Sequence, residues 1–313
     1  MIRIATRRSP LAKWQANHVA GLLRAQEPGL EVRLHELVTK GDKILEVPLA
    51  AVGGKGLFVK EIEDAVLARE AEIAVHSMKD LPALLAPGLV VAAVPEREDP
   101  RDALCSRKAR SLADLPKGAR VGTSSLRRGA QLKALRPDLR IEMVRGNVET
   151  RLRKGETELD AVVLAYAGLL RLGLAGRASY VFDPAEMLPA VAQGALALEA
   201  RADDAATLGR LARLEHLESR VRVEAERGFL KRLEGGCQVP LAGHAVVEGG
   251  RVLLRGLVAS LDGTRVVKGE RSGPAADAAR IGEALAEELL SKGAAAILKE
   301  CEGVGPAFAA PKR

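Results

Sequence analysis

The sequence predicts an α/β protein with two doubly wound domains, followed by a small C-terminal α+β domain with a three-stranded antiparallel sheet. Two observations lead to this prediction. Strand-like and helical patterns alternate through the first two-thirds of the 313 residues, and hairpin signals mark the last third. A chain of this length is expected to form two or three domains rather than one.

The first α/β domain is expected to begin with a strand at 2–6 and a helix at 9–26. Ser9 is a suitable N-cap for that helix, and Pro10 suits its first position. Apolar residues recur at helical spacing over 56–70, which predicts a second helix. Further strands are expected at 31–38, 72–77 and 89–95. This order predicts a mostly parallel sheet.

A charged loop at 95–102 precedes a second α/β domain, in which the same alternation restarts. Its strands are expected at 103–106, 119–123, 140–144 and 160–165, and its helices at 125–136 and 147–155. The apolar stretch 190–200 comes next and is a candidate to return to the first domain.

The pattern changes from about residue 217. A charged helix over 218–233 is followed by strands at 241–247, 251–259 and 264–270. Glu-Gly-Gly and Asp-Gly turns join these strands and favour hairpins. An alanine-rich helix over 274–291 completes the domain.

The net charge of +7 and the pI near 9.4 indicate an anionic partner. Nucleic acid is not expected, because only 2% of the residues are aromatic and few stacking platforms are available. The basic residues also form no dense run, which favours a small anion in a cleft.

The cysteines and the apolar runs exclude several other classes. The chain has three widely spaced cysteines and no C-x-x-C spacing, so we expect neither a disulfide framework nor a metal site. No apolar run approaches the roughly 20 residues of a membrane helix. The N-terminal segment has no signal-peptide pattern, so a cytoplasmic protein is expected.

Arginine and hydroxyl side chains recur at turns that lead from a strand to a helix. Ligands bind at such turns in open α/β sheets, where helix N-termini favour anions. Each residue alone could be an ordinary surface side chain or a helix cap. Their repetition predicts a ligand with several carboxylates or phosphates. The residues concerned are Arg7, Thr123, Ser124, Ser125, Arg127, Arg128, Arg145 and Arg151.

Asp80 is an acidic residue in an otherwise cationic region, directly after the strand at 72–77. It could be an ordinary turn residue, since the same Asp-Leu-Pro tripeptide recurs at 114–116 in a loop. Its position at a strand end favours a functional role. An ionised carboxylate there would stabilise a cationic intermediate or transfer a proton.

Lys55 and Cys237 lie in glycine-rich loops. Lys55 in "AVGGKGLF" fits a mobile anion-binding loop or a flexible surface turn equally well. Cys237 in "EGGCQVP" has an approachable thiol, which suits a nucleophile or an attachment point. No histidine partner is evident nearby, so a structural role for this cysteine stays open.

Eight segments, in order, resemble motifs of the porphobilinogen deaminase family, whose members are also called hydroxymethylbilane synthases. The resemblance spans nearly the whole chain. The segments are "RIATRRSPLAKWQA", "GGKGLFVKEIE", "AVHSMKDLP", "PEREDPRDAL", "VGTSSLRRGAQL", "RGNVETRL", "LPAVAQGALALEAR" and "LEGGCQVP".

The resemblance implies two α/β domains similar to type II periplasmic binding proteins, plus a small α+β domain. The first domain would comprise 1–95 and about 195–215, and the second would comprise 96–194. The third domain, 216–313, would carry the cofactor cysteine.

The resemblance also implies the reaction. Four porphobilinogen molecules would be joined, each with loss of ammonia, to a dipyrromethane primer, and hydrolysis would then release hydroxymethylbilane. One dipyrromethane per chain would be attached to Cys237 through a thioether. Asp80 would interact with pyrrole N–H groups, stabilise the cationic azafulvene and help to move protons.

The carboxylates of the substrate and of the growing chain are the anions that the resemblance implies. The residues that would hold the primer are Lys79, Asp80, Thr123, Ser125, Arg127 and Arg128. Those that would bind the substrate are Arg7, Ser9, Lys55, Arg145, Arg151, Arg171 and Gln193. The family precedent is a monomer that needs no metal, nucleic acid or membrane.

The chain departs from the family pattern at three positions. Ala51 stands where many members have lysine, Ala192 replaces a frequent glycine, and Ala200 replaces a frequent cysteine. None of these changes affects Asp80 or Cys237.

Two rival hypotheses are a binding protein that closes on an anion without chemistry, and a basic nucleic-acid binder. The first leaves Asp80 and the Gly-Gly-Cys loop unexplained, and the second predicts an affinity that falls steeply with salt.

Overall fold

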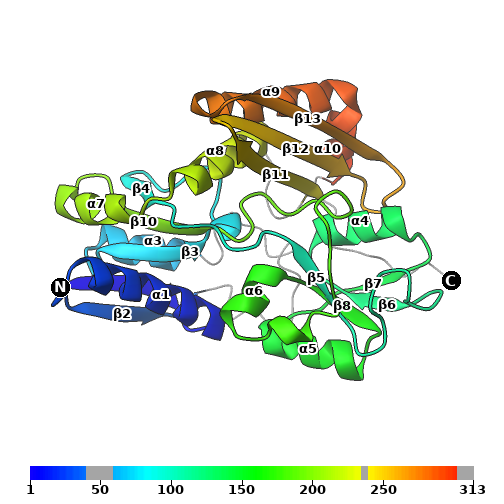
Figure 1. Ribbon diagram of the computed structural model, residues 1–313, viewed down its shortest axis with the longest axis horizontal. Coiled ribbons are helices and arrows are strands. Elements are labelled where there is room, and N and C mark those ends of the chain that lie inside the picture. Colours follow the sequence, from blue (N-terminus) through cyan, green and yellow to red (C-terminus); the bar gives the residue numbers. More distant parts are fainter. Residues whose placement is uncertain (40–58, 234–238, 302–313) are drawn as a thin grey trace. The chain divides into compact units, whose positions relative to one another are not determined.

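The computed structural model describes residues 1–39, 59–233 and 239–301. Contacts divide these residues into two units, which are described separately (Figure 1). The first unit holds 1–39, 59–98 and 194–220. The second unit holds 99–193, 221–233 and 239–301.

A five-stranded sheet with the order β2-β1-β3-β10-β4 forms the centre of the first unit. Strand β1 (Ile2–Arg7) pairs in parallel with β2 (Val32–Leu37) and β3 (Ile73–Ser77). Strand β10 (Leu196–Arg201) runs antiparallel between β3 and β4 (Leu89–Ala93). The apolar stretch after residue 190 therefore returns to the first sheet, where every residue of β10 is buried.

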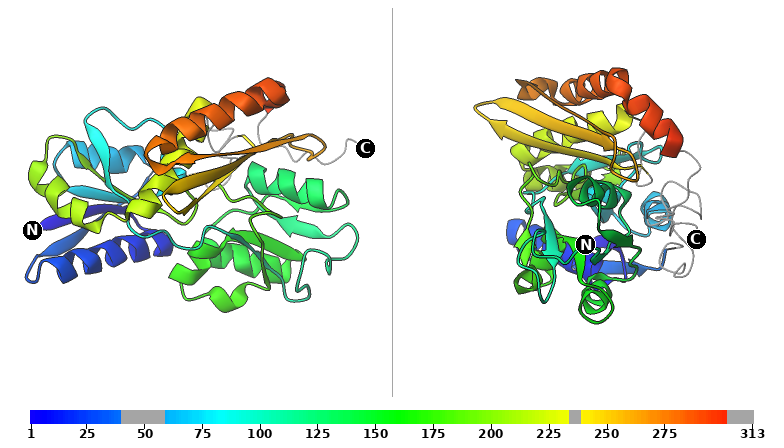
Figure 2. Two further views of the ribbon diagram at one scale, coloured as in Figure 1. Left: turned by 45° about the horizontal axis from the view of Figure 1, so that its top comes forward. Right: turned by 90° about the vertical axis from the view of Figure 1, so that its right-hand side faces the viewer.

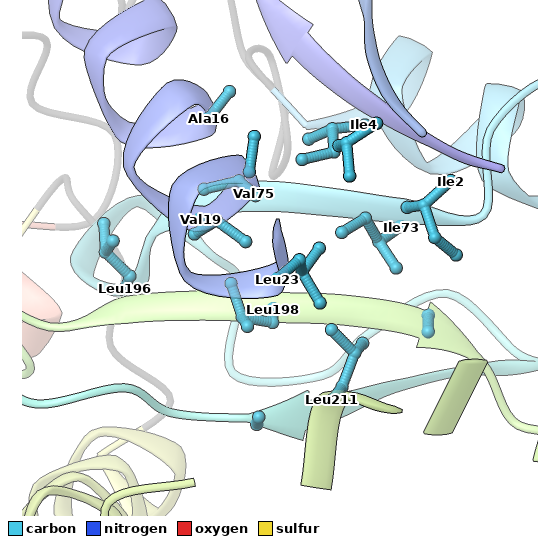
Figure 3. Close-up of a cluster of buried hydrophobic side chains, with 14 of the residues drawn as sticks. Ile2, Ile4, Ala16, Val19, Leu23, Ile73, Val75, Leu196, Leu198 and Leu211 are labelled. Atoms are coloured by element: carbon cyan, nitrogen blue, oxygen red, sulfur yellow. The ribbon is translucent and has the colours of Figure 1, made fainter. Parts of the chain in front are cut away.

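One face of this sheet is covered by helix α1 (Pro10–Gln26). The helix begins where the sequence predicts, because the Ser9 hydroxyl accepts the backbone N–H of Ala12 and Pro10 takes the first helical position. Figure 3 shows the buried side of the helix against the strands. The residues labelled there are Ile2, Ile4, Ala16, Val19, Leu23, Ile73, Val75, Leu196, Leu198 and Leu211.

The opposite face is covered by helix α3 (Lys60–Leu67), whose Ile62 and Val66 pack against Ala5 and Ala74. Because helices cover both faces, β3 and β10 are almost entirely buried, whereas the edge strand β2 has polar and partly exposed residues. A polar or charged side chain in such a strand therefore needs a specific partner.

The second unit contains another five-stranded sheet, with the order β7-β6-β8-β5-β9. Strand β6 (Arg120–Gly122) pairs in parallel with β7 (Arg140–Glu142) and β8 (Ala161–Ala165). Strand β5 (Asp102–Cys105) runs antiparallel to β8 and to β9 (Tyr180–Val181). The helices that accompany this sheet are α4 (Leu126–Leu135), α5 (Val148–Thr157) and α6 (Tyr166–Arg171).

The second unit also holds the antiparallel sheet β11 (Leu241–Glu248), β12 (Arg251–Ala259) and β13 (Val266–Pro274). Gly249 and Gly250 both have positive φ, as a two-residue hairpin turn requires. Figure 2 shows α9 (Ala278–Leu289) lying along this sheet.

Helix α8 (Leu217–Arg232) packs closely on α9, since a Cβ at Gly228 or Gly282 would overlap backbone atoms of the other helix. The buried Glu226 of α8 accepts the backbone N–H groups of Ala192 and Ala245, the latter at 2.8 Å. Ala192 has a φ of 57°, a left-handed conformation that alanine adopts only at some cost.

The remaining elements are short. They are α7 (Ala205–Leu211), α10 (Ala295–Cys301), the 3₁₀ turns η1 (Met78–Asp80), η2 (Ala175–Arg177), η3 (Ala212–Leu214) and η4 (Ala275–Asp277), and the π-helical turn η5 (Leu290–Ala294).

The α/β class and the antiparallel C-terminal sheet predicted from the sequence are confirmed. The predicted division into three domains stays a prediction, because the contacts place the C-terminal sheet and the second α/β sheet in one unit. The sequence patterns did not predict α6, α7, α10 or β9.

We predict that Gly282→Ala lowers the free energy of unfolding by about 1–3 kcal/mol or more, because the new methyl group would overlap the Ala225 carbonyl oxygen. Urea unfolding measures the change. Gly21→Ala is the matched control, since Gly21 is an exposed helix residue and a methyl group placed there would meet no atom within 4 Å. It should raise stability by about 0.5–1 kcal/mol. Equal effects of the two changes would contradict the close helix contact.

Candidate functional site

The first unit has a small pocket at the carboxyl ends of β1 and β3. Arg7 ends β1, Ser9 caps α1, and Asp80 ends the turn that follows β3. All three line the pocket, whose volume is about 80 Å³, together with Gln15, His76 and Ser77. The strand ends thus bring together three of the residues that the sequence pattern indicated.

The chain segment that carries Asp80 is held by backbone and side-chain bonds. The backbone N–H of Met78 donates to Ala195 O at 2.9 Å, which extends the pairing of β3 with β10. The side-chain amide of Gln15 donates to Ser77 Oγ at 2.8 Å. Asp80 is exposed and Lys79 is half-buried, so the carboxylate lies at the surface of a fixed turn.

Two buried titratable residues lie beneath this turn, and the sequence pattern did not identify them. His76 Nε2 lies 3.0 Å from Glu199 Oε2, and Glu199 is completely buried. Within the described residues, Glu199 Oε1 has no hydrogen-bond partner. The sequence contains one signal that could have identified them: each is a titratable residue inside an apolar run, in "IAVHS" and in "LALEAR".

Glu63 of α3 belongs to the same group of charges. Burial raises the pKa of Glu63, and the nearby Glu199 carboxylate raises it further, while His76 acts in the opposite direction. Glu63 Oε1 is a buried oxygen without a hydrogen-bond partner among the described residues. Glu63 is therefore expected to destabilise the fold when it is ionised.

In the second unit, the predicted residues follow the carboxyl end of β6. Thr123 is buried, and its hydroxyl accepts the backbone N–H of Ser125 at 3.2 Å. Ser125 caps α4 by accepting the N–H of Arg128. The first turn of α4 then carries Arg127 and Arg128, which are only 5% and 6% exposed.

Both arginines are bound to Asp102, the first residue of β5, which is completely buried. Arg127 Nη1 donates to Asp102 Oδ2 at 2.7 Å, and Arg128 Nε donates to Oδ1 at 2.9 Å. Gln193 Nε2 also donates to Oδ1, at 2.9 Å. We call these four residues the Asp102 cluster.

Backbone carbonyl oxygens complete the Asp102 cluster. Arg127 Nη1 donates to Leu188 O at 2.8 Å, and Arg128 Nη1 donates to Val163 O at 3.2 Å. Burial raises the pKa of Asp102, but the charges of Arg127 and Arg128 outweigh it and hold this pKa well below the ordinary aspartate value. Asp102 is thus ionised wherever the protein is folded at ordinary pH.

Asp102 was not selected from the sequence, because "PRDAL" resembles an ordinary strand start. The resemblance implies that Arg127 and Arg128 contact the primer and that Gln193 contacts the substrate. In the structure these three side chains also form hydrogen bonds with other residues of the chain. They bond extensively within the chain, so any ligand would meet side chains that are already fixed. Their roles toward a ligand stay predictions.

The other predicted arginines of this unit lie on neighbouring elements. Arg145 is half-buried just before Asn147, which caps α5 by accepting the N–H of Thr150 at 2.8 Å. Arg151 Nε donates to Gly146 O at 2.8 Å. Arg171 ends α6 and is 7% exposed.

Lys55 and Cys237 lie outside the described residues, so their predicted roles are not addressed by the structure. The two other cysteines are buried. Burial raises the pKa of Cys105 to about 12 and also raises the pKa of Cys301. In the described part of the chain, no three potential ligands are grouped to hold a metal ion, and no helix there is long and apolar enough to cross a membrane.

These features define an α/β protein in which each unit has cationic side chains at the carboxyl ends of parallel strands, and such side chains suit carboxylate ligands. The chain belongs to the porphobilinogen deaminase family. Residues 2–209 match the family model described as porphobilinogen deaminase, dipyromethane cofactor binding domain, and residues 220–291 match its C-terminal domain.

Two curated relatives have the name porphobilinogen deaminase. The protein from Syntrophobacter fumaroxidans is 53% identical over 96% of this chain and 97% of its own length. The protein from Nitratidesulfovibrio vulgaris is 56% identical over 97% of this chain and 98% of its own length.

The solved structures that are similar include proteins that bind small molecules. One is a periplasmic substrate-binding protein of an ABC transporter from Coxiella burnetii, with a TM-score of 0.44 and 15% identity over 68% of this chain and 91% of that chain. Another is a nutrient-binding protein from Burkholderia cenocepacia bound to methionine, with a TM-score of 0.42 and 16% identity over 67% of this chain and 90% of that chain.

We predict that Glu63→Gln stabilises the protein at neutral pH but not in acid. A group whose pKa is raised on folding contributes stability below its unfolded pKa, about 4.3 for glutamate, and loses that contribution as pH rises through the folded pKa. The difference in unfolding free energy between the variant and the wild type should therefore grow from pH about 4 upward.

Urea unfolding at a series of pH values measures this difference. Glu96→Gln makes the same chemical change at an exposed position of the same unit and is the control. Stability curves of wild type and Glu63→Gln that stay parallel across the pH series would contradict the raised pKa.

Proposed function

We propose that this member of the porphobilinogen deaminase family is a hydroxymethylbilane synthase. The family consists of transferases of tetrapyrrole biosynthesis, and its dipyrromethane-binding domain covers most of the chain. In the proposed reaction, four porphobilinogen molecules are condensed in turn with loss of ammonia, and water releases the linear tetrapyrrole. The observation that carries the proposal is the pocket in which Asp80 lies with Arg7 and Ser9.

The arginines would bind the acetate and propionate groups of porphobilinogen. A guanidinium group pairs with a planar carboxylate through two parallel hydrogen bonds, which fixes both position and orientation. Arg7 would do this in the first unit, where the Ser9 hydroxyl would add a single hydrogen bond, and Arg145, Arg151 and Arg171 would do it in the second. Lys55 and Gln193 would add further polar contacts.

Asp80 would act on the reacting ring. Loss of ammonia from the aminomethyl group creates positive charge, which a fixed carboxylate stabilises. The cations that bind the substrate would oppose this charge, so an acidic group is needed at the point of reaction. Asp80 suits the role because its turn is anchored at Ala195, directly before β10, while its side chain is exposed.

Cys237 is the proposed attachment point of one dipyrromethane per chain. The buried Cys105 and Cys301 are poor nucleophiles, because each has a raised pKa and the thiolate is the reactive form. When bound, the dipyrromethane supplies the free pyrrole position to which the first substrate is joined.

The residues of the second unit fit a group of this kind. Arg127 Nε is buried and has no hydrogen-bond partner among the described residues, so this donor is left unsatisfied by the chain itself. Thr123, Ser125, Arg128 and Lys79 would provide the other contacts. We also propose that the protein acts in the cytoplasm as a monomer, on the precedent of the family.

The intact mass of the denatured protein tests the attachment. We expect the wild type to exceed its sequence mass by one dipyrromethane and Cys237→Ser to show no excess. If the wild type lacks the excess, it should be incubated with porphobilinogen and weighed again. A mass that still does not change would contradict the proposed function.

We predict that Asp80→Asn lowers turnover of porphobilinogen by at least about 100-fold, because the amide cannot stabilise positive charge or transfer a proton. The intact mass should show that the variant keeps its dipyrromethane. Asp114→Asn changes the same residue in the same Asp-Leu-Pro tripeptide and is the matched control. Near-normal turnover by Asp80→Asn would exclude the role given to this carboxylate.

A further inference from the structure

The Asp102 cluster contains a carboxylate that the proposed function does not use. Asp102 is completely buried, and each of its oxygens binds a different arginine. A buried carboxylate with two guanidinium partners is costly to assemble, because every charge must be removed from water. Apolar residues could pack β5 against α4 without this cost, so the buried charges favour a functional role.

The contacts fix both guanidinium groups at two points. Arg127 is held by Asp102 and by Leu188 O. Arg128 is held by Asp102 and by Val163 O, with Gln193 Oε1 a further acceptor at 3.4 Å. Asp102 binds both arginines directly, so it sets the orientation of each relative to the other.

The charges within the cluster do not balance. It contains two guanidinium groups and one carboxylate, so one positive charge is in excess. Arg127 Nε is buried without a partner among the described residues, and an unpaired buried donor of this kind is unfavourable. One further carboxylate would satisfy both the charge and the donor.

We propose that Asp102 is a positioning residue, which holds Arg127 and Arg128 in one arrangement and balances one of their charges so that the cluster takes a single carboxylate of the bound pyrrole chain. The inference rests on the proposed function, in which these two arginines hold the dipyrromethane. Asp102 acts through the arginines and does not itself touch the ligand. Without it, the two like charges would separate and the carboxylate would lose its fixed partners.

The test is chemical rescue of Asp102→Ala. We expect the turnover of porphobilinogen per dipyrromethane-loaded molecule to fall by about tenfold or more, as is typical when a residue that orients a binding group is removed. Intact mass gives the fraction of molecules that carry dipyrromethane. Turnover is divided by that fraction, so a loss of dipyrromethane does not lower the turnover per loaded molecule. Added formate should restore turnover in a saturable way, because it supplies a carboxylate of the missing size. Formamide, which is neutral and similar in size, should not.

Asp138→Ala is the matched control. Asp138 binds Arg136 just past the C-terminal end of the same helix, outside the Asp102 cluster. Its turnover per loaded molecule should equal that of the wild type and should not respond to formate. A purely structural role for Asp102 predicts that formate raises its melting temperature but leaves turnover below that temperature unchanged, and this result would overturn the proposal.

Two further variants cover the case in which Asp102→Ala does not fold. Asp102→Asn keeps the shape and loses the charge, whereas Asp102→Glu keeps the charge. We expect the loaded Asn variant to lose turnover about tenfold and the Glu variant to retain more of it. Equal turnover in these two variants would overturn the proposal. A wild type that does not convert porphobilinogen would instead overturn the proposed function, so the two failures are distinguishable.

Discussion

The hydrogen bonds of one segment, from Leu188 to Arg201, support both candidate sites. Leu188 O and the side chain of Gln193 bind the Asp102 cluster. A few residues later, Ala195 O accepts the N–H of Met78, and β10 then pairs with β3. The turn that presents Asp80 and the arginines of α4 therefore depend on the same stretch of backbone.

The cationic side chains of the two units differ in burial and in their bonding partners. In the first unit, Arg7 lines an open pocket at the end of β1. In the second, Arg127 and Arg128 are buried and bound to an internal carboxylate. Buried charges are costly, but they are also less screened by solvent and salt than exposed ones. The positions of Arg127 and Arg128 are therefore less sensitive to salt than that of an exposed arginine.

Much of the fold was predictable because local signals agree with it. The Ser9 and Asn147 caps, the Gly249-Gly250 turn and the apolar strands all have short-range causes. The same applies to Asp80, whose position after β3 follows from the strand pattern. Elements such as α7 lie in stretches without a strong pattern, and their helices depend on packing that a sequence does not reveal.

The partners of the arginines were not predictable for a related reason. Asp102 and Arg128 are far apart in the chain, and only the pairing of β5 with β8 places the carboxylate beside α4. The same holds for His76 and Glu199, which meet because β10 returns beside β3. In each case the residue type indicated charge or polarity, but long-range topology decided its partner.

The left-handed Ala192 has a consequence for the exchange of backbone protons with solvent. Its N–H is donated to the buried Glu226 of α8, and Ala192 itself is 1% exposed. Solvent can reach that amide only when α8 and the turn before Gln193 separate. The conformation also stores roughly 1 kcal/mol or more of backbone strain, which separation would release. The exchange rate of this one amide thus reports how often the helix that leads toward Cys237 detaches from the segment that binds the Asp102 cluster.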